Sequence, residues 1–211
     1  MLIPEKILEK CHSYGMRDYP EETCGFIVGK KDVPESLEEI YPMKNIMNDM
    51  HHENPKKFPL TGKNGFMIAP LEQIKLERIL SKKNQKIKII YHSHPDVGAY
   101  FSTKDKEDAL WNGKERFPGI SFLVCATNQG KPGEAILAEF NTTKGDFEIK
   151  HIPNLSKKRS SKLLGGKFGI TGILPTLDYI HKWKKGEHEL ENGYFRFAPP
   201  KQVKKLQKKL C

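Results

Sequence analysis

Two histidines, a serine and an aspartate form the group of side chains in this sequence that is best suited to chemistry. His92 and His94 leave an apolar run, and Ser102 and Asp105 follow shortly after it. Side chains at i and i+2 of a strand project from the same side, so both imidazoles can reach one ion. With Asp105 as an oxygen ligand, this set would leave one position for water, as a catalytic zinc site requires.

Hydrolysis at such a site also needs a group that accepts a proton. Bound zinc lowers the pKa of water to about 7, and a nearby carboxylate can take up the proton. Glu22 is the candidate, because it comes just before an apolar run, although its neighbour Glu21 is a second acid. Either acid could instead be a solvated loop residue. Ser102 could donate a hydrogen bond to an oxyanion formed on the substrate carbonyl.

The elements that must position these residues follow from the spacing of apolar side chains. Pro4 and Pro70 suit first helical positions, and Ser102 suits a helix N-cap. The stretch 44–65 is rich in Asn, Pro, Lys and Gly and predicts a long loop. The expected helices are 4–14, 70–82 and 103–113, and the expected strands are 23–29, 36–42, 66–68, 87–91, 120–126, 134–140 and 146–151. Several consecutive strands with few helices predict an α/β fold with a mixed or largely antiparallel sheet.

Charge divides the chain into two predicted parts. Residues 1–152 carry 22 basic and 22 acidic residues, whereas residues 153–211 carry 14 and 4, which accounts for the net charge of +10. We therefore expect a domain over 1–152 and a basic C-terminal extension over 153–211. The extension could pack onto the domain, bind an acidic protein partner, or contact nucleic acid, in descending order of expectation.

Other features favour a cytoplasmic protein. The apolar runs fall short of the roughly 20 residues that cross a bilayer, and the N-terminus shows no signal-peptide pattern. The four cysteines form no Cys-x-x-Cys pair, and Cys24 and Cys125 lie in apolar runs that favour packing over reactivity.

The pattern of Glu22, then His92-x-His94, then Ser102 and Asp105 resembles the JAMM (MPN+) metallopeptidases. Glu22 stands at that family's spacing before Gly29, and the string from His92 to Ser102 is especially similar to the bacterial branch. The resemblance, over about residues 1–150, implies a cytidine-deaminase-like mixed sheet sandwiched by helices. It also implies one Zn²⁺ bound by His92, His94 and Asp105, with Glu22 as base and Ser102 as oxyanion donor.

The resemblance further implies a substrate. The bacterial branch hydrolyses bonds after the C-terminal Gly-Gly of ubiquitin-like or sulfur-carrier proteins, whose tails would be gripped near the loop 44–65. Iron or manganese could occupy similar ligands. Two other functions stay open: a non-catalytic binding module with the same fold, and a nucleic-acid-associated protein of the RadC type, which has a similar His-x-His-Pro string.

Overall fold

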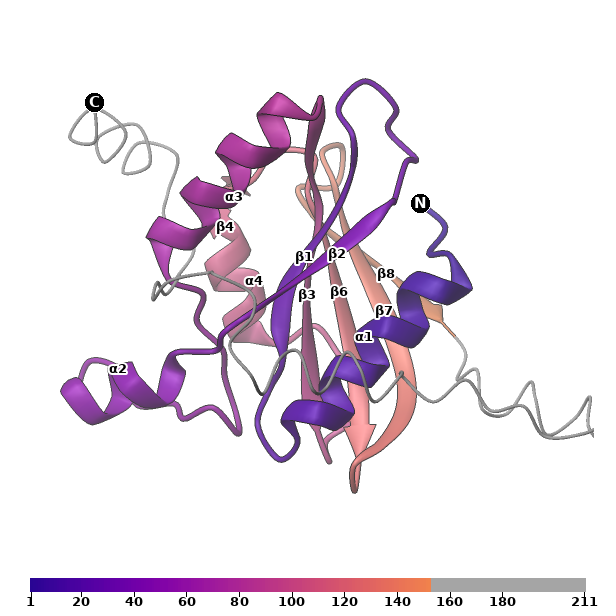
Figure 1. Ribbon diagram of the computed structural model, residues 1–211. Coiled ribbons are helices and arrows are strands. Elements are labelled where there is room, and N and C mark those ends of the chain that lie inside the picture. Colours follow the sequence, from indigo (N-terminus) through magenta and orange to yellow (C-terminus); the bar gives the residue numbers. More distant parts are fainter. Residues whose placement is uncertain (153–211) are drawn as a thin grey trace, which may run out of the picture.

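A six-stranded mixed sheet with helices on both faces forms the domain (Figure 1). The computed structural model describes residues 1–152, so the segment 153–211 and the roles predicted for it lie outside the described residues. The elements in chain order are α1 (Glu5–Asp18), β1 (Cys24–Lys30), β2 (Glu39–Met43), α2 (Met47–Glu53), α3 (Pro70–Lys82), β3 (Gln85–Pro95), α4 (Thr103–Ala109), β4 (Leu110–Trp111), β5 (Lys114–Glu115), β6 (Ser121–Asn128), β7 (Lys131–Asn141) and β8 (Asp146–Ile152).

The strand order of the main sheet is β2-β1-β3-β6-β7-β8. The pairing of β3 with β6 is parallel, and the other pairings in this sheet are antiparallel. β3 therefore lies inside the sheet with a partner on each side, and its residues from Ile87 to His94 are all buried. The predicted α/β fold with a mixed sheet between helices is confirmed.

Alternation along the strands divides the core into two layers. On one face, Ile7, Leu8 and Cys11 of α1 pack on residues such as Ile89 and Tyr91. The other face carries α3 and α4 (Figure 1). The buried side chains of the core layer on this face include Phe26, Ile68, Leu76, Leu80, Ile90, Ala109 and Phe122. Because neighbouring residues of β3 point to opposite faces, His92 projects toward the α3 and α4 side.

Three predicted elements differ from the structure. The expected strand 66–68 does not form a ladder, because Met67 pairs only with Ile46 and with the side chain of Asn45. The expected loop 44–65 contains the short helix α2.

The third difference lies at the end of α4. This helix ends at Ala109, and the chain then forms the β4–β5 hairpin. Asn112 and Gly113, interpreted as a helix end, have φ of 49° and 71° and occupy the two-residue turn of that hairpin. Asn-Gly is the preferred sequence for such a turn, because both positions need positive φ. Among residues 1–152, no helix is long and apolar enough to span a membrane.

Candidate metal centre

The two histidines occupy the carboxyl end of β3, where the strand leaves the sheet. Cys24 of β1 pairs with His92 on one side, and Ala126 of β6 pairs with His94 on the other. Both rings are buried, and their Nε2 atoms lie 3.1 Å apart. The predicted projection of both imidazoles to one side of the strand is confirmed.

Asp105 joins the histidines because the chain folds back over β3 after the loop 95–101. Ser102 caps α4 by accepting a hydrogen bond from the Asp105 backbone N–H at 3.0 Å. In return, Asp105 Oδ2 accepts hydrogen bonds from the Ser102 N–H at 2.9 Å and the Ser102 hydroxyl at 2.6 Å. This reciprocal capping box fixes one carboxylate oxygen and leaves Oδ1 at 3.5 Å from His92 Nε2.

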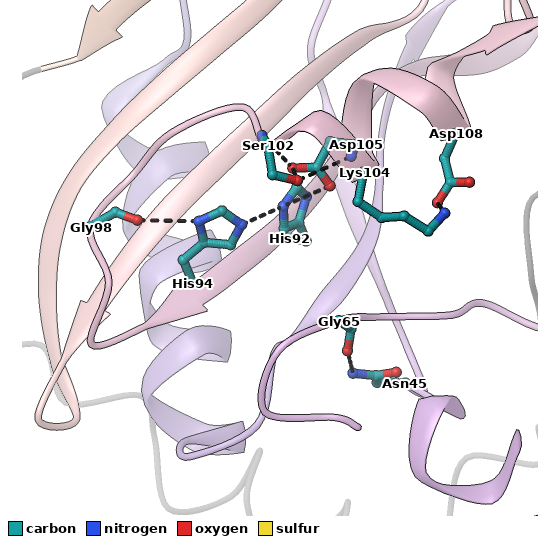
Figure 2. A network of polar contacts seen from close by, with 9 residues as sticks. All are labelled: Asn45, Gly65, His92, His94, Gly98, Ser102, Lys104, Asp105 and Asp108. Carbon is teal, nitrogen blue, oxygen red and sulfur yellow. Dashed lines mark hydrogen bonds and ion pairs between the residues drawn. The ribbon is translucent and has the colours of Figure 1, made fainter. Parts of the chain in front are cut away.

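Figure 2 shows the three side chains converging on one point. One ligand atom from each of His92, His94 and Asp105 lies within 4.8 Å of the other two. In a tetrahedral zinc site with bonds of about 2.0–2.1 Å, ligand atoms are about 3.3 Å apart. The observed separations of 3.1 and 3.5 Å bracket that value. The donor types, and the two separations that involve His92, therefore suit a zinc ion.

The protonation of the histidines also suits a metal site. Burial lowers the pKa of His92 to about 4, although the charge of Asp105 opposes this shift. Burial likewise lowers the pKa of His94. His94 Nδ1 lies 3.2 Å from the Gly98 carbonyl, so a proton on Nδ1 can be donated there. Both rings are then neutral, and the Nε2 lone pair of His94 faces the site.

Glu22 lies at the same edge of the sheet. Extending the β1–β3 register by two residues beyond the Cys24–His92 pair places Glu22 opposite His94. Alternation puts its side chain on the face that carries His92. Glu22 is 6% exposed, whereas Glu21 accepts a hydrogen bond from Asn48 at 2.6 Å and is only half-buried.

The pKa of Glu22 follows from its buried position. Burial is the main cause that raises this pKa well above the usual range, and the charge of Asp105 raises it further. A carboxylate with a raised pKa accepts a proton more readily than an exposed one.

Two aromatic neighbours were not identified from the sequence. The ring of Phe66 stacks on His92 with centroids 4.6 Å apart, and the ring of Tyr100 lies 4.6 Å from that of His94. No spacing rule links either aromatic residue to the histidines. Only the occurrence of Tyr100 in the loop between His94 and Ser102 could have indicated its position.

A mixed α/β sheet that brings a candidate His-His-Asp ligand set and a buried glutamate to one edge suits a metallohydrolase. The family described as prokaryotic homologues of the JAB domain matches residues 4–138. The chain therefore belongs to this family, which confirms the predicted resemblance.

Two relatives and one solved structure are similar to this chain. The chain is 28% identical over 122 residues to a probable TtuB-protein conjugate cleaving protease of Thermus thermophilus, covering 58% of this chain and 69% of the relative. It is 23% identical over 122 residues to the desampylase of Haloferax volcanii, covering 58% and 74%. A solved structure of a Salinibacter ruber protein matches with 21% identity and a TM-score of 0.48, covering 72% of this chain and 90% of that one.

Proposed function

We propose that this protein is a zinc-dependent peptidase or isopeptidase that hydrolyses the bond after the C-terminal Gly-Gly of a ubiquitin-like or sulfur-carrier protein. The observation that carries the proposal is the convergence of His92, His94 and Asp105 at the edge of the sheet where buried Glu22 precedes β1. The names of the two relatives, which refer to cleavage of TtuB conjugates and to desampylation, support the substrate class.

His92 Nε2, His94 Nε2 and Asp105 Oδ1 would hold the zinc ion. When bound, zinc supplies Lewis-acid polarisation of the scissile carbonyl and acidifies a water molecule. The protein contributes the orientation of its ligands. Gly98 holds the His94 ring, and the Ser102 cap holds the Asp105 carboxylate. Such supporting hydrogen bonds commonly change metal affinity or activity by about 10–100-fold when they are removed.

Glu22 would act as the general base. Its carboxylate takes a proton from the attacking water and then returns that proton to the nitrogen of the leaving amine. Burial supports both steps, because it raises the pKa of Glu22 and brings its proton affinity closer to what is needed near neutral pH.

Ser102 would support the oxyanion. Its hydroxyl has one hydrogen, which points to Asp105 Oδ2 in the structure. Contact with an oxyanion therefore requires the hydroxyl to rotate away from Asp105 during the reaction. Ser102 would then serve both the substrate and the ligand carboxylate.

The substrate tail would bind as an extended strand, with main-chain hydrogen bonds that set its register. Two glycines before the scissile bond suit a narrow channel, because any side chain there would clash with the walls. The segment 44–67 reaches Glu22 through a hydrogen bond from the Asn45 amide and one from the Glu22 N–H to the Gly62 carbonyl, and it is the expected wall of this channel.

The test combines metal analysis with mass spectrometry. A small ubiquitin-like protein ending in Gly-Gly, joined to a lysine side chain or to a peptide, is incubated with the purified protein and with Glu22→Gln. We expect one zinc per chain in both proteins, and cleavage after Gly-Gly at only a small residual rate in Glu22→Gln. Glu21→Gln is the matched control and should cleave normally. Near-normal turnover by zinc-loaded Glu22→Gln would remove Glu22 from the mechanism, and no cleavage by the unaltered protein would refute the function.

A further inference from the structure

Glu22 lies just outside the β1–β3 ladder, so its backbone groups are not paired by the sheet. The ladder-like contacts end at Thr23, whose N–H donates to Ser93 Oγ and whose carbonyl accepts from the Ser93 N–H, both at 2.9 Å. β1 itself begins at Cys24. The position of the proposed base therefore depends on partners outside β1 and β3.

Both partners come from the segment 44–67. The Glu22 N–H donates to the Gly62 carbonyl at 2.6 Å. The Glu22 carbonyl accepts from the side-chain amide of Asn45 at 3.0 Å. The backbone of Glu22 is thus held on both sides by a segment distant from it in the sequence.

Asn45 uses its whole hydrogen-bonding capacity in the junction between the segment 44–67 and Glu22. Its amide nitrogen donates to the carbonyls of Glu22 and Gly65, each at 3.0 Å (Figure 2 shows the Gly65 contact). Its amide oxygen accepts from the N–H groups of Met47 at 2.9 Å and Met67 at 3.0 Å. A primary amide has two donor hydrogens and two acceptor lone pairs, and all four are used.

The same junction also fixes the aromatic residue that contacts the metal ligand. Phe66 lies between Gly65 and Met67, which are both bonded to Asn45, and its ring stacks on His92 at 4.6 Å. Asn45 therefore connects the backbone of Glu22 to the ring that packs against His92. One side chain sets the distance between the two halves of the site.

We infer that Asn45 is a positioning residue that holds Glu22 in register with the metal ligands, an inference that rests on the proposed function. The informative variant is Asn45→Asp, which has almost the same shape. In aspartate, one carboxylate oxygen can still accept the hydrogen bonds from the Met47 and Met67 N–H groups. The other oxygen replaces the NH₂ group that donates to the carbonyls of Glu22 and Gly65, so it repels those carbonyls.

A displacement of about 1 Å at a catalytic group can cost about 100-fold in rate. We therefore expect kcat of Asn45→Asp to fall by about 10–100-fold, with KM changed less than about 3-fold and the zinc content unchanged. Asn141→Asp is the matched control, because Asn141 at the end of β7 has the same bonding pattern outside the segment 44–67. Its Oδ1 accepts from the N–H groups of Thr143 at 2.9 Å and Lys144 at 3.0 Å, and its amide nitrogen donates to Glu148 at 2.8 Å. Asn141→Asp should retain normal kcat.

A double-mutant cycle separates positioning from a general loss of structure. If Asn45 acts through Glu22, adding Asn45→Asp to Glu22→Gln should lower the residual rate by less than about 2-fold. An equal loss in both backgrounds, a normal kcat in the single variant, or loss of zinc would overturn the inference. Thermal unfolding of each variant identifies a temperature at which all of them are folded.

A crystal structure of Asn45→Asp gives a readout that does not depend on activity. We expect the Glu22 carboxylate to move by about 1 Å relative to His92 and His94, whose own positions stay fixed. If the Glu22 carboxylate keeps its position in Asn45→Asp, the inference about Asn45 is refuted, whatever the activity of the unaltered protein. If the unaltered protein cleaves no conjugate, the proposed function is refuted, and the crystal structure still tests the role of Asn45.

Discussion

Ser102→Ala is a direct test of how the proposed metal centre is built, because it removes two hydrogen bonds to the candidate ligand Asp105. The hydroxyl accepts from the Asp105 N–H at 3.0 Å and donates to Asp105 Oδ2 at 2.6 Å. Loss of an N-cap costs about 1 kcal/mol, and a hydrogen bond to a charged group contributes about 1.5–3 kcal/mol. Because both bonds involve the same two residues, the contributions overlap.

We therefore expect zinc-free Ser102→Ala to be less stable by about 1–3 kcal/mol. Its zinc affinity should fall by about 10–100-fold, since Asp105 Oδ1 then loses its fixed direction toward His92. Urea denaturation of chelator-treated protein measures the first quantity, and competition with a chromophoric chelator measures the second. Ser102→Thr keeps the hydroxyl and should restore most of both.

Ser36→Ala is a suitable control, because Ser36 Oγ also accepts a backbone hydrogen bond, from Lys30 at 3.1 Å, and does so away from the metal centre. It should lower stability without changing zinc affinity. If Ser102→Ala bound zinc as tightly as the unaltered protein, the capping box would not be what orients Asp105, and the account of the ligand set given above would be wrong.

Two further predictions concern stability. Burial lowers the pKa of His12 to about 4 in the folded protein, against about 6.5 when unfolded, so protonation favours the unfolded chain. The free energy of unfolding should therefore fall between pH 7 and pH 4.5. In urea unfolding, His12→Gln should reduce that fall by about 2–3 kcal/mol. If the variant showed the same pH dependence as the unaltered protein, the lowered pKa of His12 would be wrong. At Gly29, an added Cβ would lie 1.8 Å from the Ser36 carbonyl oxygen, so Gly29→Ala should cost about 3 kcal/mol, the upper end for overpacking. Gly145→Ala should destabilise the protein less, because no atom lies within 4 Å of the added Cβ and only the φ of 67° opposes the change. Thermal unfolding compares the two variants, and an equal loss of stability in both would contradict the clash at Gly29.

The spatial convergence of His92, His94 and Asp105 could be predicted from the sequence, because these residues lie at element ends with simple geometry. His92 and His94 follow the alternation of a strand, and Ser102 and Asp105 follow the spacing of a helix N-cap. Glu22 was harder to place from the residues alone, since Glu21 stands beside it. The structure separates the two acids by burial, because Glu22 continues the β1 pattern and Glu21 does not.

The junction at Asn45 could not be predicted in this way. Its partners are backbone atoms of Glu22, Gly65, Met47 and Met67, and any residue type supplies such atoms. The strand expected at 66–68 was wrong for the same reason, since a side chain satisfies the Met67 N–H where a neighbouring strand was expected to do so.

The convergence of the site follows from the one parallel pairing in the main sheet. β3 and β6 are parallel, so the chain must cross back over the sheet between them, and a parallel pair needs a connection of a dozen or more residues. That crossover contains the loop 95–101 and α4, which brings Ser102 and Asp105 over the end of β3. β1 runs antiparallel to β3, so its start, preceded by Glu22, meets the end of β3 at the same edge. Topology therefore brings the ligands and the acid together, whereas their final alignment depends on the hydrogen bonds made by Ser102 and Asn45. Substitutions at these two residues should consequently impair the site while leaving the sheet intact.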